Sequence, residues 1–257
     1  MNKELIIQRF SRKLNSYNAN ARVQKLMATK LINTIDSIQS NTFLENSKIS
    51  ILEIGCGTGL LTELAAQNIA FSSYTALDIV PECENFIKSI NPKIEFVSND
   101  IEKYIDEVDK KFDLIISNAS LQWIENLSEL IKKLVEKINP NGMLLFSTFG
   151  RENFREIYYV IGKTLQYLSK SELETLLAQY KPDIEEEIRI IAFKTPKDVL
   201  KHIQSTGVNA IISENWTKKD LLKFESKYNS FCANHPTLTY NPIYVKIQKN
   251  IFAQKDN

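Results

Sequence analysis

Three glycines alternate within five positions, at Gly55, Gly57 and Gly59, between an apolar run and a stretch with helical spacing. Glycine allows positive φ and has no Cβ, so a polar ligand can approach the backbone amides at the start of the helix. The G-x-G-x-G spacing differs from the G-x-G-x-x-G of dinucleotide sites, and Glu53 before it would repel a pyrophosphate. An acid at that position instead suits a ligand with an ammonium group.

Two more acids follow the next apolar runs. Asp78 lies nineteen residues after Gly59, at the end of a predicted strand, where a carboxylate can accept hydrogen bonds from the two hydroxyls of a ribose. Asp100 ends the third run and is placed to accept from the amino group of adenine. Each acid alone is an ordinary strand-end residue. Ammonium, ribose and adenine together describe S-adenosylmethionine, so the three acids jointly indicate a site for that cofactor.

Repeated strands and helices are expected to position these residues. Short apolar runs lie at 49–55, 74–79, 94–100, 112–118 and 142–149, and each is separated from the next by enough residues for a helix. The sequence Asn-Pro-Asn-Gly at 139–142 predicts the end of a helix that begins near Leu127. Later runs at 188–193 and 239–247 complete an α/β fold with a doubly wound, mostly parallel seven-stranded sheet and an antiparallel edge pair.

The remaining segments have helical periodicity. Residues 4–40 are predicted to be helical with an interruption near 15–20. Residues 151–187 break the strand and helix rhythm and predict a helical insertion, whose stripe at 154–168 is expected to face the core. We therefore expect a single domain over 1–257. It has an N-terminal helical cap at 1–40, a Rossmann-like core at 48–150 and 188–250, and the insertion at 151–187.

Composition limits the classes of function. The chain has 257 residues, with 32 Lys and Arg against 31 Asp and Glu, so the overall charge gives no sign of nucleic-acid binding. The three cysteines are scattered and lack C-x-x-C spacing, so we expect neither disulfides nor a metal site. The first residues lack the apolar core expected of a signal peptide, and no apolar run approaches the ~18 residues of a membrane span. We expect a cytoplasmic monomer that does not bind membranes.

The sequence resembles the class I S-adenosylmethionine-dependent methyltransferases through LEIGCGTG at 52–59, the strand-end Asp78 and the SND at 98–100. The resemblance covers about residues 50–150 and implies a Rossmann-like fold with S-adenosyl-L-methionine as cofactor. It implies that the cofactor is bound by Glu53, Gly55, Cys56, Gly57, Gly59, Asp78, Ile79, Asp100, Ile101 and Asn118.

A narrower resemblance extends over nearly the whole chain. Segments at 9–27, 117–124, 144–157, 200–210 and 238–247 are similar to the malonyl-[acyl-carrier protein] O-methyltransferases of biotin synthesis. This resemblance implies methylation of the free carboxylate of a malonyl thioester carried by acyl carrier protein or CoA. The resulting ester disguises the substrate so that fatty-acid synthesis will elongate it.

A malonyl carboxylate is already ionised near pH 7, so methyl transfer to it needs no general base. The site must instead hold the carboxylate, align it and exclude water. Our candidate residues for this role are Tyr17, Gln24, Asn118, Trp123 and Arg151, with Gln122 beside them. Arg151 follows the fifth predicted strand and is expected to make a bidentate carboxylate contact. The two histidines, His202 and His235, are expected to be structural or exposed.

Two other functions remain open from the sequence. One is a small-molecule carboxyl methyltransferase of the trans-aconitate type, which resembles this chain in the N-terminal segment and in the N-A-x-x-Q-W motif. The other is an assembly factor that binds the cofactor but methylates no carboxylate. For an acidic carrier protein, a local basic face is expected, and the cluster Arg9, Arg12, Lys13 and Arg22 is our candidate.

Overall fold

The computed structural model describes residues 3–39, 48–205 and 216–249. Its main sheet has seven strands in the order β3-β2-β1-β4-β5-β9-β6. Strands β1 to β5 run parallel to one another, and β9 is antiparallel to both of its neighbours. This confirms the mostly parallel seven-stranded fold. The strands are β1 (Ile49–Ile54), β2 (Phe71–Asp78), β3 (Glu95–Ser98), β4 (Phe112–Asn118), β5 (Ile138–Phe149), β6 (Asp183–Glu186) and β9 (Pro242–Gln248).

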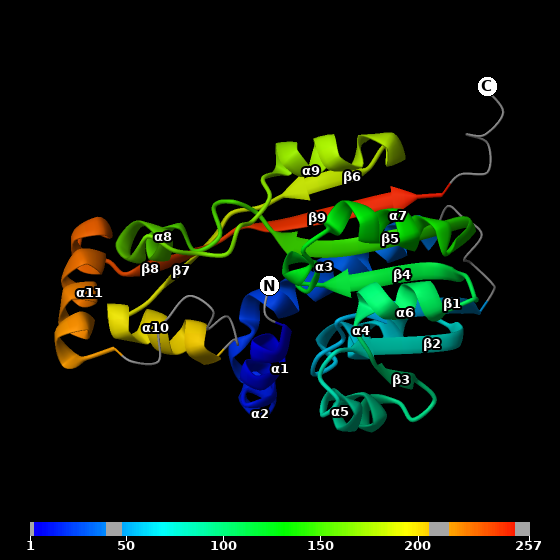
Figure 1. Ribbon diagram of the computed structural model, residues 1–257, viewed down its shortest axis with the longest axis horizontal. Helices are drawn as coiled ribbons and strands as arrows, with labels where there is room; N and C mark the ends of the chain where they lie inside the picture. Colours follow the sequence, from blue (N-terminus) through cyan, green and yellow to red (C-terminus); the bar gives the residue numbers. More distant parts are fainter. Residues whose placement is uncertain (1–2, 40–47, 206–215, 250–257) are drawn as a thin grey trace.

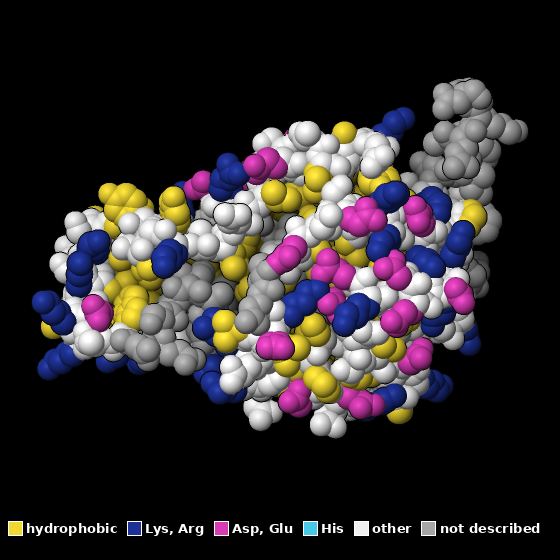
Figure 2. All heavy atoms as spheres, in the orientation of Figure 1, with side chains coloured by type: hydrophobic (Ala, Val, Ile, Leu, Met, Phe, Trp, Pro, Cys, Tyr) yellow, Lys and Arg dark blue, Asp and Glu magenta, His cyan; other side chains and the backbone are white. Residues whose placement is uncertain are grey.

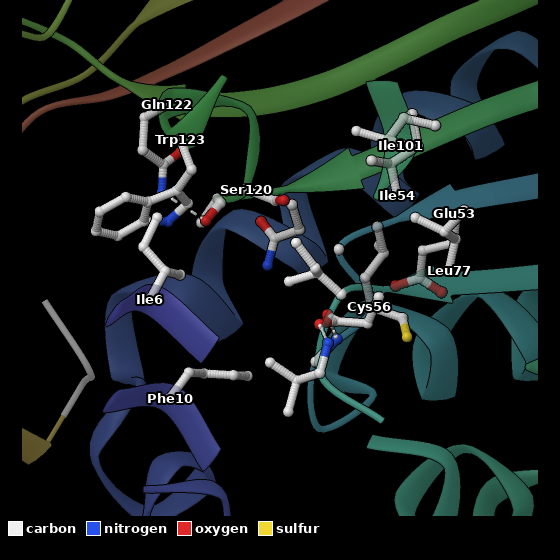
Figure 3. Close-up of a pocket in the computed structure, with 18 of the residues that line it drawn as sticks. Ile6, Phe10, Glu53, Ile54, Cys56, Leu77, Ile101, Ser120, Gln122 and Trp123 are labelled. Carbon is white, nitrogen blue, oxygen red and sulfur yellow. Dashed lines mark hydrogen bonds between the residues drawn. The ribbon is translucent and has the colours of Figure 1, made fainter. Parts of the chain in front are cut away.

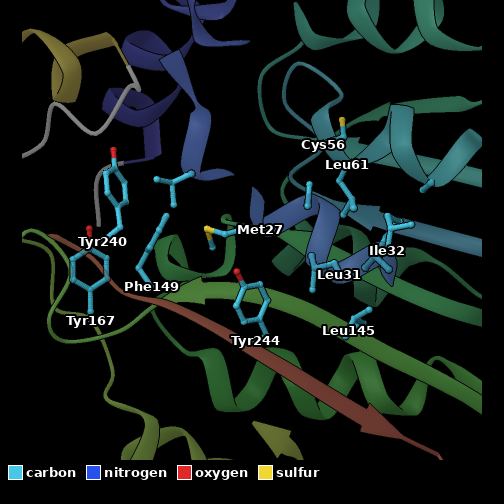
Figure 4. Close-up of a cluster of buried hydrophobic side chains, with 14 of the residues drawn as sticks. Met27, Leu31, Ile32, Cys56, Leu61, Leu145, Phe149, Tyr167, Tyr240 and Tyr244 are labelled. Carbon is cyan, nitrogen blue, oxygen red and sulfur yellow. The ribbon is translucent and has the colours of Figure 1, made fainter. Parts of the chain in front are cut away.

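Helices cover both faces of the sheet (Figure 1), because the central strands are buried on both sides. One face carries α3 (Arg22–Gln39), α4 (Leu60–Asn68) and α5 (Cys83–Ile90). The other carries α6 (Ile101–Glu107), α7 (Leu127–Glu136) and α9 (Lys170–Leu177). Figure 4 shows how α3 presents Met27, Leu31 and Ile32 to the sheet, with Tyr244 of β9 in the same cluster.

A smaller group of elements projects from the end of the sheet at which β5 finishes (Figure 1). Strands β7 (Arg189–Ala192) and β8 (Thr237–Tyr240) form a separate antiparallel pair. Helices α8 (Arg155–Ile161), α10 (Pro196–Ser205) and α11 (Lys218–Phe231) pack with this pair or with one another. We call these five elements the second lobe. Its α10 contacts α2 (Leu14–Asn20), which joins the lobe to the N-terminal helices.

Two strand assignments made from the sequence are wrong. The run at 188–193 was expected in the main sheet, but β7 pairs with β8 in the second lobe instead. The outer strand of the main sheet is β6, which lies inside the segment 151–187 that was predicted to be wholly helical. The β6 sequence DIEE buries only Ile184, so this edge strand lacks the apolar run by which strands are recognised.

The stripe predicted at 154–168 is only partly a core face. Phe154 and Ile157 are buried, but Tyr158 is 58% exposed, and α8 ends before Gly162, which has a φ of +77°. Helix α9 begins at a capping box in which Ser169 and Glu172 bond each other's backbone N–H groups.

The N-terminal residues are helical, but the interruption predicted near 15–20 is misplaced. Residues Leu14–Asn20 form α2. The two interruptions lie between α1 (Lys3–Ser11) and α2, and at Ala21 after α2. The Asn-Pro-Asn-Gly sequence at 139–142 lies just after α7, as predicted, within the irregular first part of β5. Among the described helices, none is long and apolar enough to cross a membrane.

Candidate active site

A pocket opens at the carboxyl ends of β1, β2 and β4. The strand order reverses between β1 and β4, and open α/β sheets bind ligands at such a switch point. The walls come from the turn after β1, the end of β2, the start of α6, and the short helix η1 (Leu121–Trp123), with the N-terminal helices across from them. Figure 3 shows Ile6 and Phe10 of α1 on one wall, with Glu53 and Cys56 near the sheet.

The glycine turn forms the floor of this pocket. Gly55, Gly57 and Gly59 have φ values of +68°, +52° and +83°, a region that favours glycine. A Cβ on Gly55 would lie 2.0 Å from Ser120 Oγ, and one on Gly57 would lie 3.3 Å from the Phe10 ring. Gly55 and Gly57 line the pocket, whereas Gly59 is the N-cap of α4 and is not part of the pocket wall.

Glu53 is a buried carboxylate on β1 that lines the pocket. Its Oε2 accepts hydrogen bonds from Thr62 Oγ1 at 2.7 Å and from the Tyr74 hydroxyl at 2.6 Å. Burial raises the pKa of Glu53 to about 7, although these two hydrogen bonds act in the opposite direction. The two hydroxyls hold the carboxylate in place, and no Lys or Arg among the described residues is ion-paired with it.

Asp78 ends β2 and also faces the pocket. Its Oδ2 accepts from the Gly57 N–H at 2.8 Å, and its Oδ1 accepts from the Val80 N–H at 2.9 Å. Burial raises the pKa of Asp78 to about 6, against the effect of its backbone hydrogen bonds. Asp78 therefore stabilises the glycine turn in addition to presenting a carboxylate to a ligand.

Asp100 is the N-cap of α6, where its Oδ1 accepts from the Glu102 N–H at 3.1 Å. Its Oδ2 is ion-paired with Lys3 of α1 at 2.5 Å, and Lys3 also pairs with Glu102. This contact ties the first helix across the pocket beside the position expected to bind adenine. Ile79 and Ile101 add apolar wall on the same side.

The opposite side holds four of the five residues predicted to act on the substrate, Tyr17, Gln24, Asn118 and Trp123. Burial and the nearby Asp78 carboxylate raise the pKa of the Tyr17 hydroxyl, so it remains protonated at neutral pH. Asn118 donates through Nδ2 to the backbone carbonyl of Gln24 at 3.0 Å, and its Oδ1 accepts from Ser147 Oγ at 2.7 Å. It therefore fixes α3 against the sheet.

Two buried amide oxygens at the pocket have no hydrogen-bond donor among the described residues. These are Oε1 of Gln24, whose side chain is almost fully buried, and Oε1 of Gln122. An acceptor left without a donor in a buried site costs free energy unless a ligand or water supplies one. With Glu53 and Asp78 they give the pocket an excess of acceptors, which fits a cationic ligand with several N–H and O–H groups.

Arg151 is not brought together with these residues. Its side chain is 64% exposed, and its Nη2 pairs with Glu172 Oε1 of α9 at 2.6 Å. It does not contribute to the pocket wall. The carboxylate that Arg151 contacts in this structure is therefore that of Glu172, and its contact with a substrate stays a prediction.

Several pocket residues were missed by sequence reasoning, namely Lys3, Ile6, Phe10, Thr58, Ser120 and Phe149. The residues of α1 could not be recognised from the sequence because they do not follow a predicted strand, which was the signal used for the other site residues. Thr62 and Tyr74, which donate hydrogen bonds to Glu53, were missed for a different reason. They are ordinary core positions until the fold brings their hydroxyls to the carboxylate. Among the described residues, no group of His, Cys, Asp and Glu could hold a metal ion.

Known proteins resemble the chain over nearly its full length. A family model described as "Methyltransferase domain" matches residues 21–186. The chain is 34% identical over 256 residues to a malonyl-[acyl-carrier protein] O-methyltransferase of Chlorobium luteolum, covering 96% of this chain and 95% of that relative. It is 35% identical over 244 residues to a protein of the same name from Calditerrivibrio nitroreducens, with coverage of 91% and 92%.

Solved structures share the fold at lower identity. The plantazolicin methyltransferase BpumL in complex with SAH has a TM-score of 0.57 and 19% identity, and the likeness covers 96% of this chain and 95% of that one. The fold, the matching family model and the full-length relatives all identify a methyltransferase, and the relatives identify which family it is. The chain belongs to the malonyl-[acyl-carrier protein] O-methyltransferase family.

Proposed function

We propose that this protein transfers a methyl group from S-adenosyl-L-methionine to the free carboxylate of malonyl-acyl-carrier protein, an early step of biotin synthesis. The observation that carries the proposal is the likeness to relatives of that name over 96% of the chain. The composition of the pocket supports it independently, because the acids and the aromatic walls fit the two reactants.

The cofactor end of the pocket suits a cation with a sugar. Glu53 would pair with an ammonium group, and Asp78 would accept from ribose hydroxyls while it holds the glycine turn. Ile79 and Ile101 would contact the base, beside Asp100. When bound, S-adenosylmethionine supplies an electrophilic methyl group on a sulfonium sulfur.

The acceptor needs no deprotonation, and the pocket residues agree with that chemistry. Among the described residues that line the pocket there is no histidine, and burial raises the pKa of both the Tyr17 hydroxyl and the Cys56 thiol. Transfer would join a carboxylate oxygen to the methyl carbon as the carbon–sulfur bond breaks, so the pocket residues would not have to move a proton. The task of the protein is to bind, align and dry the two reactants.

Donors and apolar walls near the acceptor come from the N-terminal helices and from η1. The protonated Tyr17 hydroxyl and the Nε2 N–H groups of Gln24, which unlike its Oε1 are donors, are the groups proposed to hold the malonyl carboxylate. Trp123, Phe149 and Phe10 line the pocket and reduce its contact with water, which strengthens the attraction between the carboxylate and the sulfonium.

The proposal is tested by comparing methyl transfer to malonyl-carrier protein, malonyl-CoA, free malonate and acetyl-carrier protein. We expect transfer to the malonyl thioesters and none to the acetyl thioester, which has no carboxylate. Transfer to a free dicarboxylic or tricarboxylic acid, without any transfer to malonyl thioesters, would reassign the protein to small-molecule methylation. Binding of S-adenosylhomocysteine without transfer to any acid would favour a cofactor-binding assembly factor.

A further inference from the structure

Helix α11 in the second lobe presents a row of unpaired positive charges. Lys219, Lys223 and Lys227 recur every four residues and therefore lie on one face of the helix. All three are exposed, while Phe224 and Tyr228 on the other side of the helix are buried. None of the three is ion-paired with a carboxylate of the described chain. Asp220, next to Lys219, accepts from the N–H and hydroxyl of Thr217 in a capping box, which lowers its pKa together with the nearby charges of Lys223 and Lys219.

Exposed aromatic side chains border this row. Tyr159 of α8 is 70% exposed and stacks on Phe231 at the end of α11, with ring centroids 4.2 Å apart. Tyr158, beside it, is 58% exposed. Figure 2 shows Lys and Arg side chains along α11 and hydrophobic side chains over α8 on the same end of the molecule. Exposed aromatic surface marks interaction sites, and charge beside it can select the partner.

The second lobe is directly connected to the pocket. Strand β5 ends at Phe149, which lines the pocket, and the chain enters α8 a few residues later. Helix α10 packs on α2, which supplies Tyr17 to the pocket wall. A partner bound to α8 and α11 would therefore rest beside α10, which packs on both α11 and α2, and so lie close to the elements that frame the substrate side.

We propose that the α11 lysine row and the Tyr159–Phe231 pair form the docking surface for an acidic acyl carrier protein. The proposal rests on the proposed function, in which the malonyl group arrives on such a carrier. Charge complementarity selects the partner, since three unpaired ammonium groups attract an acidic helix and repel a basic one. The aromatic pair then supplies apolar area at the edge of the charged row.

This surface replaces the cluster expected from the sequence. Of Arg9, Arg12, Lys13 and Arg22, only Arg12 and Arg22 are exposed. The other two are half-buried in the N-terminal helices, so the four residues do not form one exposed basic face. The α11 row has three exposed lysines on a single helix face.

The test is a triple charge reversal, Lys219→Glu with Lys223→Glu and Lys227→Glu, studied with two malonyl donors. We expect kcat/KM for malonyl-carrier protein to fall by about tenfold or more, mainly through KM. Transfer to malonyl-CoA, which brings no protein to dock, should stay within about twofold. A matched reversal of three exposed lysines on the sheet half, Lys93, Lys103 and Lys132, should affect neither substrate. Tyr159→Ser should give a smaller, carrier-specific loss.

Direct binding of holo-carrier protein, measured by calorimetry, separates this proposal from the proposed function. If the wild-type protein binds the carrier and the triple variant does not, the docking surface is supported even if no malonyl thioester is methylated. The proposal is overturned if the triple variant binds and methylates malonyl-carrier protein like the wild type. It is equally overturned if only Arg12→Glu with Arg22→Glu abolishes docking, or if the lysine row binds a short DNA duplex and no carrier.

Discussion

The pocket and the second lobe differ in how their buried carboxylates are compensated and in where their charged side chains lie. The pocket buries two carboxylates, Glu53 and Asp78, without a Lys or Arg ion-paired to either among the described residues, and burial raises the pKa of both. The second lobe buries one carboxylate, Glu156, whose oxygens accept from the Thr239 N–H at 2.9 Å and hydroxyl at 2.6 Å. The α11 lysines Lys219, Lys223 and Lys227 are exposed to water and form no ion pair with a carboxylate of the described residues.

This difference separates a binding site from a structural one. A buried charge is costly unless hydrogen bonds or an opposite charge compensate it. Glu156 is compensated within the chain and ties α8 to β8. Glu53 and Asp78 are held by hydrogen bonds but lack a cation, so a cationic ligand would complete their environment. Four predictions test this comparison.

The largest effect is expected for Gly55→Ala, compared with Gly162→Ala in the second lobe. Both glycines have positive φ, so each alanine costs about 1–2 kcal/mol of backbone strain. Only the Gly55 Cβ clashes, at 2.0 Å from Ser120 Oγ, whereas a Cβ on Gly162 has nothing within 4 Å. Gly55→Ala should therefore lose about 2–5 kcal/mol of unfolding free energy. It should also lose cofactor binding. Chemical denaturation and calorimetry measure the two effects, and equal losses for both variants would refute the packing argument.

Asp78→Asn and Glu156→Gln should separate affinity from stability. Asp78→Asn is expected to weaken S-adenosylhomocysteine binding by about 1–3 kcal/mol, because an acceptor for ligand hydroxyls and for the Gly57 N–H is impaired. Glu156→Gln should lower the free energy of unfolding by a similar amount and leave the affinity within about twofold. Calorimetric titration and denaturation of each variant decide this. A larger affinity loss in Glu156→Gln would place the second lobe in the cofactor site.

Cofactor affinity should depend on the ionisation of Glu53. Its pKa of about 7 means that the side chain is neutral below that pH and charged above it. An ammonium group prefers the charged form, so affinity should rise with pH through about 6 to 8, and binding near pH 6.5 should release protons.

Titrations in buffers with different ionisation enthalpies measure that proton release. Asp78, with a pKa of about 6, also titrates in the pocket, so the variant Glu53→Gln isolates the Glu53 contribution. The variant should bind more weakly and release fewer protons. Proton release identical to that of the wild type would assign the effect to Asp78 or to the ligand.

The smallest effect is expected for Arg151→Ala. Its guanidinium pairs with Glu172 at the surface and is outside the pocket wall, so kcat/KM for malonyl-carrier protein should stay within about twofold. Steady-state kinetics measure this, with Tyr17→Phe as the comparison inside the pocket. A loss of tenfold or more in Arg151→Ala would show that Arg151 moves to the substrate during turnover, as its sequence position first suggested.

The placement of the strand-end residues was predictable from the sequence because it depends on local features. Gly55 and Gly57 lie in the turn after the buried strand β1, Asp78 is the last residue of β2, and Asp100 follows β3. The carboxyl ends of adjacent parallel strands meet at one edge of the sheet, so the order of the strands already brings these residues together. The mostly parallel sheet was predictable for the same reason, since its central strands are continuous apolar runs.

Only the tertiary structure decided which remote side chains complete the site and the sheet. These contacts join different elements of secondary structure: the hydrogen bonds of Thr62 and Tyr74 to Glu53, the ion pair of Lys3 with Asp100, and the ion pair of Arg151 with Glu172. Packing between elements also decided that β6, and not the predicted run at β7, forms the edge of the main sheet. Periodicity and spacing report local conformation, whereas these contacts depend on how helices and loops pack across long sequence distances, which no local pattern specifies.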